Sequence, residues 1–269
     1  MISIEEILKK EIVYKIDDME NVNIQKNIMY GVVNKEELLM DLYTPFSNDK
    51  KEKLPVVIVV HGEAASIDFK ETGQYITYGK LVAAYGFNAV TFNHKVLSEG
   101  FSIEEVINDI DALVNYLIEN ADKLNIDKNR IAIWCFSGGV TFGLYVGMHD
   151  YSKNIKGVIA YYGFGDFTSV GELLQFHIQD EEVERYSPIN LIKESSSKIP
   201  PLFVARAGLD SPIINESIDR FIVEGLKNNL NINIYNHSTG GHGFDLFNDN
   251  NRTHEIIAES LIFLRKHLK

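Results

Sequence analysis

The stretch Trp134-Cys135-Phe136-Ser137-Gly138-Gly139 decides how the rest of the sequence is interpreted, because an apolar run ends there and a glycine-containing run begins. Residues 130–136 predict a β-strand, and residues 138–149 predict a helix. Ser137 then lies on a sharp turn between strand and helix, where a nucleophilic hydroxyl is exposed. The usual pattern has glycine two residues before the serine, whereas Cys135 stands there in this chain. The alternatives are a serine that only caps the helix and a nucleophilic Cys135, although we expect Cys135 to be a buried structural thiol.

Strands and helices alternate on both sides of this stretch. Apolar runs predict further strands at residues 22–33, 38–43, 56–60, 87–92, 158–162, 202–207 and 232–236. Apolar residues at helical spacing predict further helices at residues 74–85, 102–117, 213–226 and 255–268. The first two strands are expected to form an antiparallel hairpin. The alternation therefore predicts an α/β fold with a mostly parallel, doubly wound sheet of about eight strands and helices on both faces.

We expect residues 1–269 to form a single domain with two additions. Apolar residues at helical spacing predict a helical lead-in within residues 1–20. Residues 164–199 interrupt the alternation and are expected to form a short lid or cap insertion, because long inserts in compact domains often cover a site. Phe164, Phe167 and Phe176 from this insertion are candidates for lining a substrate pocket. The alternative is that these aromatic side chains only pack the insertion onto the sheet.

The composition excludes several classes of protein. The 26 basic and 38 acidic residues give a net charge of −12, so neither nucleic acid nor an anionic membrane surface is expected as a partner. Cys135 is the only cysteine, which allows no internal disulfide. The first residues lack the basic stretch and apolar core of a secretory signal, and no apolar run is long enough to span a bilayer. The sequence therefore predicts a cytoplasmic protein.

Two further chemical groups follow predicted strands. Asp210 comes just after the strand at 202–207, at the same carboxyl edge of the sheet as Ser137, where open α/β sheets place their sites. Asp166 is the alternative acid. His242 lies in a glycine-rich loop after the last strand, and it is favoured over His237. A carboxylate beside an imidazole can orient that imidazole as the base for a serine nucleophile.

A fourth group, His61-Gly62-Glu63-Ala64, follows the strand at 56–60. A loop at this place can supply a backbone N–H that stabilises an oxyanion, while the residue after the nucleophile, Gly138, supplies another. Gly62 or Glu63 is the candidate donor from this loop, and His61 is a candidate for the substrate pocket. An ordinary loop after a strand is the alternative.

These motifs together resemble the α/β-hydrolase superfamily, within its dienelactone hydrolase-like and small-acyl esterase branch. The resemblance runs from about residue 39 to the end of the chain, and the chain order of serine, aspartate and histidine is that of the superfamily. The resemblance implies a serine esterase that cleaves small-molecule carboxylic esters, of short acyl chains, with Ser137, Asp210 and His242 as its triad. It implies no cofactor and no metal.

Two departures leave other functions open. Cys135 replaces the first glycine of the serine motif, and Glu63-Ala64 replace glycines of the usual loop after the strand. Glu63 also brings a carboxylate near the place where negative charge would develop. A serine peptidase of the oligopeptidase-like branch and a non-catalytic ligand-binding protein with this fold are the alternatives.

Overall fold

The computed structural model describes residues 3–33, 35–46, 52–149, 151, 153–168, 180–195 and 198–269. Its strands are β1 (Asn23–Val33), β2 (Glu36–Thr44), β3 (Leu54–Val60), β4 (Asn88–Phe92), β5 (Ile126–Phe136), β6 (Ile155–Tyr161), β7 (Leu202–Ala207) and β8 (Ile232–His237). Its α-helices are α1 (Ile4–Leu8), α2 (Gly73–Ala84), α3 (Ile103–Glu119), α4 (Ala121–Leu124), α5 (Gly139–Met148), α6 (Asp180–Tyr186), α7 (Pro188–Ser195), α8 (Pro212–Lys227), α9 (Phe244–Phe247) and α10 (Asn251–Leu268). Three short 3₁₀ turns are η1 (Met19–Asn21), η2 (Phe69–Glu71) and η3 (Leu97–Glu99).

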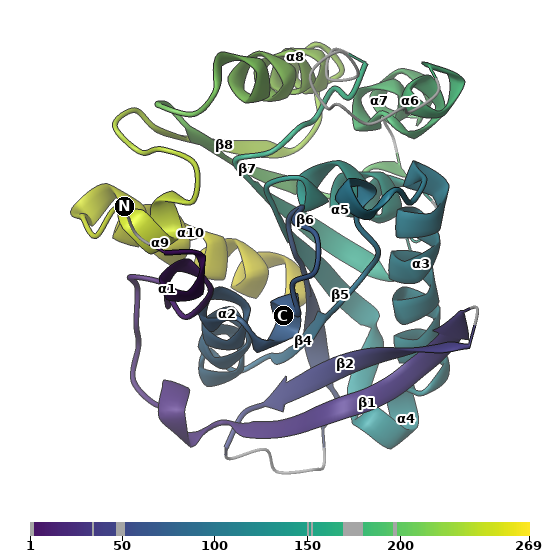
Figure 1. Cartoon of the computed structure of the whole chain (residues 1–269), viewed down its shortest axis with the longest axis vertical. Helices are drawn as coiled ribbons and strands as arrows, with labels where there is room; N and C mark the ends of the chain where they lie inside the picture. Colours follow the sequence, from purple (N-terminus) through teal and green to yellow (C-terminus); the bar gives the residue numbers. More distant parts are fainter. Residues whose placement is uncertain are drawn as a thin grey trace.

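The described strands form one sheet in the order β1-β2-β4-β3-β5-β6-β7-β8 (Figure 1). β1 pairs antiparallel with β2, and β2 pairs antiparallel with β4. All the remaining neighbours, from β4 through β3 to β8, are parallel. The predicted fold class is confirmed, including the antiparallel hairpin at the start.

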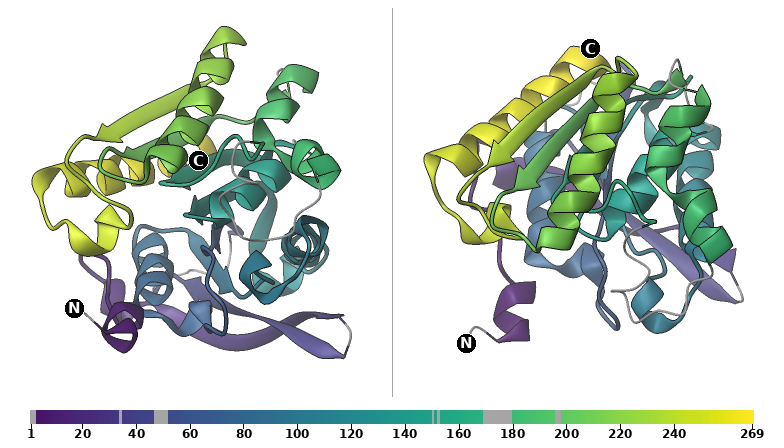
Figure 2. Two further views of the ribbon diagram at one scale, coloured as in Figure 1. Left: turned by 45° about the horizontal axis from the view of Figure 1, so that its top comes forward. Right: turned by 90° about the horizontal axis from the view of Figure 1, so that it is seen from above.

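Alternate residues of each central strand enter two different cores, because side chains of a strand point to opposite faces. Ile58 and Ile133 pack with α3, α5, α7 and α8 on one face. Val57 and Trp134 pack with α2 and α10 on the other face. Figures 1 and 2 show these two helical layers on opposite sides of the twisted sheet. A sheet covered on both faces needs strands that are apolar throughout, which explains the unbroken apolar run of β3.

Two additions differ in detail from the predictions. α1 ends at Leu8, so only a short part of the N-terminal lead-in is α-helical; Ile12 lies in the core beyond the helix end. Within the insertion, the described helices α6 and α7 pack mainly beside α3, α5 and α8. Tyr186 of α6, for example, contacts Tyr145 of α5 with ring centroids 5.1 Å apart. Among the described residues, no helix combines the length and the apolar character needed to cross a bilayer.

Candidate active site

Ser137 occupies the predicted turn, directly after β5 and two residues before α5. Its φ of 52° lies in the left-handed region, which costs a non-glycine residue on the order of 1–3 kcal/mol. The turn fits only because a glycine lies opposite it. A Cβ on Gly163 would lie 2.2 Å from the Ser137 carbonyl oxygen. The strained backbone is therefore held between β5 and the loop after β6.

Ser137, His242 and Asp210 form a continuous hydrogen-bonded chain. The Ser137 Oγ lies 2.7 Å from His242 Nε2, and His242 Nδ1 lies 2.7 Å from Asp210 Oδ2. The Asp210 side chain is only 4% exposed, and its other oxygen accepts a hydrogen bond from the Ser211 N–H. The carboxylate therefore holds one imidazole nitrogen, while the other faces the hydroxyl. The structure brings together the three residues that the sequence singles out.

The loops after β7 and β8 are joined to each other by backbone hydrogen bonds. The Leu209 N–H donates to the Gly240 carbonyl at 2.9 Å, and the Gly208 N–H donates to the His237 carbonyl at 2.9 Å. These bonds fix the loop that carries Asp210 against the loop that carries His242. Their separation is set by strand pairing, since β7 and β8 are parallel neighbours.

The two alternative residues from the sequence serve other purposes. Asp166 Oδ2 accepts from Arg220 Nε at 2.7 Å, and its Oδ1 accepts from the Thr168 hydroxyl at 2.6 Å. His237 is fully buried, with its Nε2 3.0 Å from the Thr253 hydroxyl. The predicted preference for Asp210 and His242 therefore agrees with the geometry.

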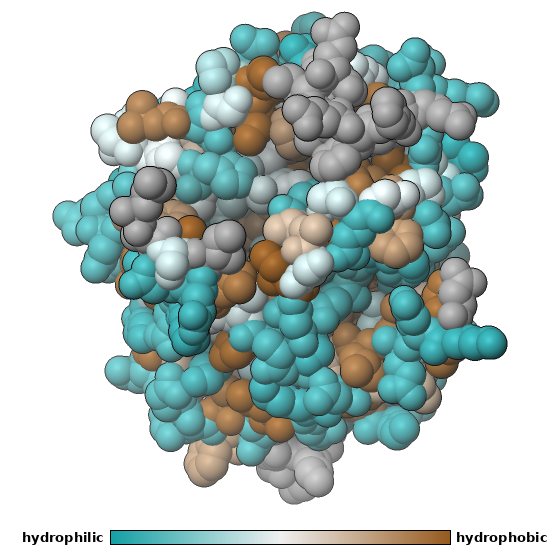
Figure 3. Space-filling view, in the orientation of Figure 1, coloured by the Kyte–Doolittle hydropathy of each residue, from teal (hydrophilic) through white to brown (hydrophobic). Residues whose placement is uncertain are grey.

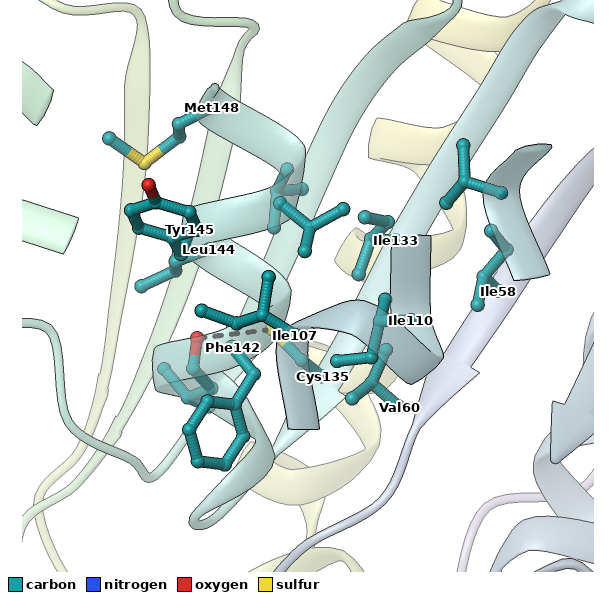
Figure 4. Close-up of a cluster of buried hydrophobic side chains, with 14 of the residues drawn as sticks. Ile58, Val60, Ile107, Ile110, Ile133, Cys135, Phe142, Leu144, Tyr145 and Met148 are labelled. Atoms are coloured by element: carbon teal, nitrogen blue, oxygen red, sulfur yellow. Dashed lines mark hydrogen bonds between the residues drawn. The ribbon is translucent and has the colours of Figure 1, made fainter. Parts of the chain in front are cut away.

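Cys135 is a buried structural residue, as expected. Figure 4 shows it among the apolar side chains of Val60, Ile110 and Phe142, and its Sγ donates to the Ile159 carbonyl at 3.2 Å. Burial raises the pKa of its thiol far above the ordinary value, which disfavours the nucleophilic thiolate.

The space for Cys135 comes from the neighbouring helix. A Cβ on Gly143 of α5 would lie 2.6 Å from the Cys135 Cβ. The usual motif has its glycine on the strand, at the position of Cys135. In this chain the glycine that makes room is Gly143, on the helix that packs against the strand.

The loop after β3 presents one of the two expected backbone donors. The Gly62 N–H already donates to the Tyr75 hydroxyl at 3.0 Å, which leaves Glu63 as the candidate from this loop. A Cβ on Gly138 would lie 3.4 Å from the Glu63 backbone nitrogen, so the two residues are in close contact. In the part of the chain that the structure describes, neither N–H meets a hydrogen-bond acceptor. Glu63 and Gly138 are therefore the candidate donors to an oxyanion beside Ser137.

His61 does not line the substrate cavities, so its assignment to the pocket is corrected. Its ring is buried and stacked between His94 and Phe69, with centroids 3.6 and 4.1 Å away. Its Nε2 accepts from the His94 N–H at 3.0 Å, and its Nδ1 lies 2.7 Å from the Gly62 carbonyl. Burial holds the pKa of His61 well below its ordinary value. The neutral ring therefore links the loop after β3 to the loop after β4.

The Glu63 side chain passes beside Gly138, and its carboxyl group reaches η3. Its Oε2 accepts from the Ser98 N–H at 3.4 Å, and its Oε1 is buried with no hydrogen-bond partner among the described residues. Its Cγ lies only 2.3 Å from where a Gly138 Cβ would be. Burial raises the pKa of this carboxyl from 4.5 to about 7.

Two cavities of about 260 Å³ each meet at Ser137, His242 and Glu63. We call the first the insertion lobe. It is lined chiefly by Leu97, Phe142, Phe164, Phe167 and Ile214. We call the second the α1 lobe. It is lined chiefly by Ile7, Leu8, Ile67, Phe69, Tyr75, Tyr162, Leu246 and Phe247. Figure 3 shows apolar residues exposed near the centre of this mostly polar face.

The insertion supplies two of the three predicted aromatic residues to the cavity. Phe164 and Phe167 form an edge-to-face pair with centroids 6.2 Å apart, and both line the insertion lobe. Phe167 is almost fully buried, so it also packs the insertion onto the domain. Phe176 lies outside the described residues.

Asp245 is a buried carboxylate that the sequence analysis missed. It accepts from the Tyr162 hydroxyl at 2.6 Å, from Gln74 Nε2 at 2.9 Å and from the Tyr78 hydroxyl at 3.1 Å. The Tyr162 ring packs against His242, with centroids 4.9 Å apart. Asp245 therefore ties the histidine loop to α2 and to the end of β6. The sequence offers only its position three residues after His242 as a signal.

The described residues contain no group of three or more histidine, cysteine, aspartate or glutamate side chains arranged to hold a metal ion.

Comparison with solved structures shows the same fold at low sequence identity. Esterase 2 of Thermogutta terrifontis, phosphonylated by cyclosarin, has a TM-score of 0.71 and 16% identity, covering 91% of this chain and 95% of that one. Its butyrate-bound form gives 0.69 and 16%, covering 93% and 95%. A truncated carbohydrate esterase from gut microbiota gives 0.75 and 16%, covering 93% and 99%.

Comparison of sequences identifies the family. No curated protein sequence matches the chain significantly. The BD-FAE family model matches residues 40–219, a stretch that runs from β2 into α8 and includes the serine turn. The chain therefore belongs to the BD-FAE family, an esterase family of the α/β-hydrolase superfamily, and is a carboxylic ester hydrolase.

Proposed function

We propose that the chain hydrolyses small carboxylic esters of short acyl chains through an acyl-enzyme on Ser137. The observation that carries this proposal is the hydrogen-bonded chain from Ser137 through His242 to Asp210, with 2.7 Å at each step. A non-glycine residue held at a φ of 52° at the end of a central strand supports it, since such strain clusters at functional sites.

The first half of the reaction transfers the acyl group to the enzyme. His242 Nε2 takes the proton of Ser137 as the hydroxyl oxygen bonds to the ester carbonyl carbon. The carbonyl oxygen becomes an oxyanion, which the N–H groups of Gly138 and Glu63 stabilise. The carbon–oxygen bond to the alcohol then breaks, and the imidazolium gives its proton to the departing alkoxide.

The second half repeats these steps with water. His242 takes a proton from the water molecule, whose oxygen bonds to the acyl carbon. The bond to Ser137 then breaks, and the proton returns to the serine oxygen, releasing the carboxylic acid. Asp210 keeps the imidazole in the tautomer that accepts at Nε2 throughout.

The size of the cavity favours short acyl groups. We place the acyl chain in the insertion lobe. The bulky side chains of Phe164 and Phe167 line this lobe and would limit the length of the acyl chain. Esterase 2 of T. terrifontis has been solved with propionate and with butyrate bound, and both are short acids. The mostly apolar lining of both lobes favours simple esters over a carbohydrate substrate.

Substitution of Ser137 tests the proposal. Ser137→Ala is expected to lose about 10⁴–10⁶ in kcat for p-nitrophenyl acetate and to lose labelling by a fluorophosphonate, while keeping its circular dichroism spectrum. Cys135→Ala is the matched control and is expected to keep activity and labelling. An active Ser137→Ala protein and an inactive Cys135→Ala protein would contradict the proposal.

Substitution of the two acids tests the assignment of Asp210. Asp210→Asn is expected to lower kcat by about 10⁴, because the amide favours the wrong imidazole tautomer. Asp166→Asn should keep most activity, since the Asp166 carboxylate accepts a hydrogen bond from Arg220 rather than from His242. The same large loss in Asp166→Asn alone would mean that the acid is misassigned.

A further inference from the structure

The first residues of the described chain form one wall of the site. Ile7 and Leu8 of α1 line the α1 lobe, opposite residues of α2 and α9. Figure 1 shows α1 between α9 and α2, and Figure 2 shows it protruding from the body of the domain. A protruding helix with two apolar side chains directed to a cavity covers that cavity from outside.

The segment behind α1 is fitted closely to the start of α2. A Cβ on Gly73 would lie 2.5 Å from the Lys9 carbonyl oxygen and 2.7 Å from that of Lys10. Only glycine at this position lets the segment pass so close to the helix. The Ile12 N–H then donates to the Thr77 hydroxyl at 3.2 Å, and the Ile12 side chain is buried.

The same segment is bonded to the histidine loop. The Val13 N–H donates to the Asp245 carbonyl at 2.9 Å, and Lys10 Nζ lies 5.6 Å above the centre of the Phe247 ring. At its other end α1 begins with a capping box, in which Ser3 and Glu6 bond each other's backbone N–H groups. The segment that follows α1 is thus anchored to the domain, and the capping box stabilises the first turn of the helix that carries Ile7 and Leu8.

We propose that α1 is the wall that limits the size of the leaving alcohol, so that the enzyme prefers esters of compact, apolar alcohols. This inference rests on the proposed function, which places the acyl chain against Phe164 and Phe167 and leaves the α1 lobe for the alcohol. The lobe has few polar groups, and its volume of about 260 Å³ is small for a ligand site. Ile7 and Leu8 are accordingly specificity-determining residues.

The test uses the Ile7→Ala, Leu8→Ala double variant and two series of esters. One series keeps acetate and lengthens the alcohol from methanol to octanol. The other keeps methanol and lengthens the acid from acetate to octanoate. We expect the double variant to raise kcat/KM for the octyl ester relative to the methyl ester by about tenfold or more, because one excluded methylene alone is worth roughly 10–200-fold. The acid series should keep its wild-type order.

Two further variants keep the test decisive. Gly73→Ala displaces the segment behind α1 and should shift alcohol preference in the same direction. Ile262→Ala is the matched control, because Ile262 is an exposed isoleucine of α10 that lines neither lobe. An unchanged alcohol order in the double variant, or a change in the acid series instead, overturns the inference. A wild-type protein that hydrolyses neither series and takes no fluorophosphonate overturns the proposed function itself.

Discussion

The buried carboxyl group of Glu63 is expected to make ester hydrolysis depend on pH. Its carboxyl has a pKa of about 7, and its side chain lies beside Gly138, whose N–H group is proposed to hold the oxyanion. Below this pKa the group is neutral, whereas above it a buried negative charge lies close to the place where the oxyanion is proposed to form. We therefore expect kcat/KM to fall as the pH rises through about 7 and Glu63 ionises. The measurement is a pH profile of ester hydrolysis.

Substitution separates this effect from other causes of an alkaline decline. Glu63→Gln cannot ionise, so its activity should stay level above pH 7. Glu99 is the neighbouring acid whose charge raises the pKa of Glu63, so Glu99→Gln should move the decline to slightly lower pH. A decline that is identical in wild type and Glu63→Gln would show that Glu63 does not titrate against the oxyanion.

The free energy of unfolding should also depend on the ionisation of Glu63. Because the folded pKa of Glu63 is raised above 4.5, its neutral form is favoured in the folded state. That contribution is fully present below pH 4.5 and is lost as the pH rises through about 7. The difference in unfolding midpoint between wild type and Glu63→Gln should therefore grow in favour of the variant between pH 4.5 and 8.

At the scale of elements, β5 and α5 fit together through Cys135 and Gly143. Cys135 stands where the usual serine motif has glycine, and Gly143 of α5 leaves the space for its side chain. Gly143→Ala should destabilise the protein by about 1–3 kcal/mol, because the new Cβ would overlap Cys135. Adding Cys135→Gly restores a glycine on the strand and should recover part of that loss. Urea unfolding of the two single variants and the double variant measures the coupling. Strictly additive changes would show that the two positions do not share the space.

The insertion provides the prediction on acyl length. Phe167→Ala removes a buried ring from the insertion lobe, so longer acyl chains should gain in kcat/KM relative to acetyl. The change is measured with p-nitrophenyl esters from acetate to decanoate. Tyr186→Ala is a matched control, since Tyr186 packs against α5 and lines neither lobe. A wild-type preference for decanoate over acetate would contradict the short-acyl proposal.

These elements also show what the sequence could predict. β3 and the second half of β5 are apolar runs, and α3 has a clear apolar face, so local pattern suffices for them. Ser137, Asp210 and His242 follow β5, β7 and β8, and this order predicts the hydrogen-bonded chain because parallel strands end at one edge. α9 has only four residues and no periodicity to detect.

Other features depend on contacts between distant residues, which periodicity does not contain. His61 follows β3 and therefore suggests a pocket residue, but its orientation is set by stacking on His94 and Phe69. The role of α1 likewise depends on the approach of Gly73 to the Lys9 and Lys10 carbonyls. Helical spacing can predict α1, but it cannot predict what α1 covers.

At the scale of the whole molecule, the bond between Val13 and Asp245 joins the two extremes of the described chain. Contacts of such long sequence separation close large loops and form slowly. The protein's single tryptophan, Trp134, lies in the central core, so its fluorescence reports core formation separately. During refolding we expect Trp134 fluorescence to recover first, and the discrimination between methyl and octyl esters to return only when the N-terminal segment docks. Newly collapsed molecules would then hydrolyse esters with a broader choice of alcohol than the mature enzyme.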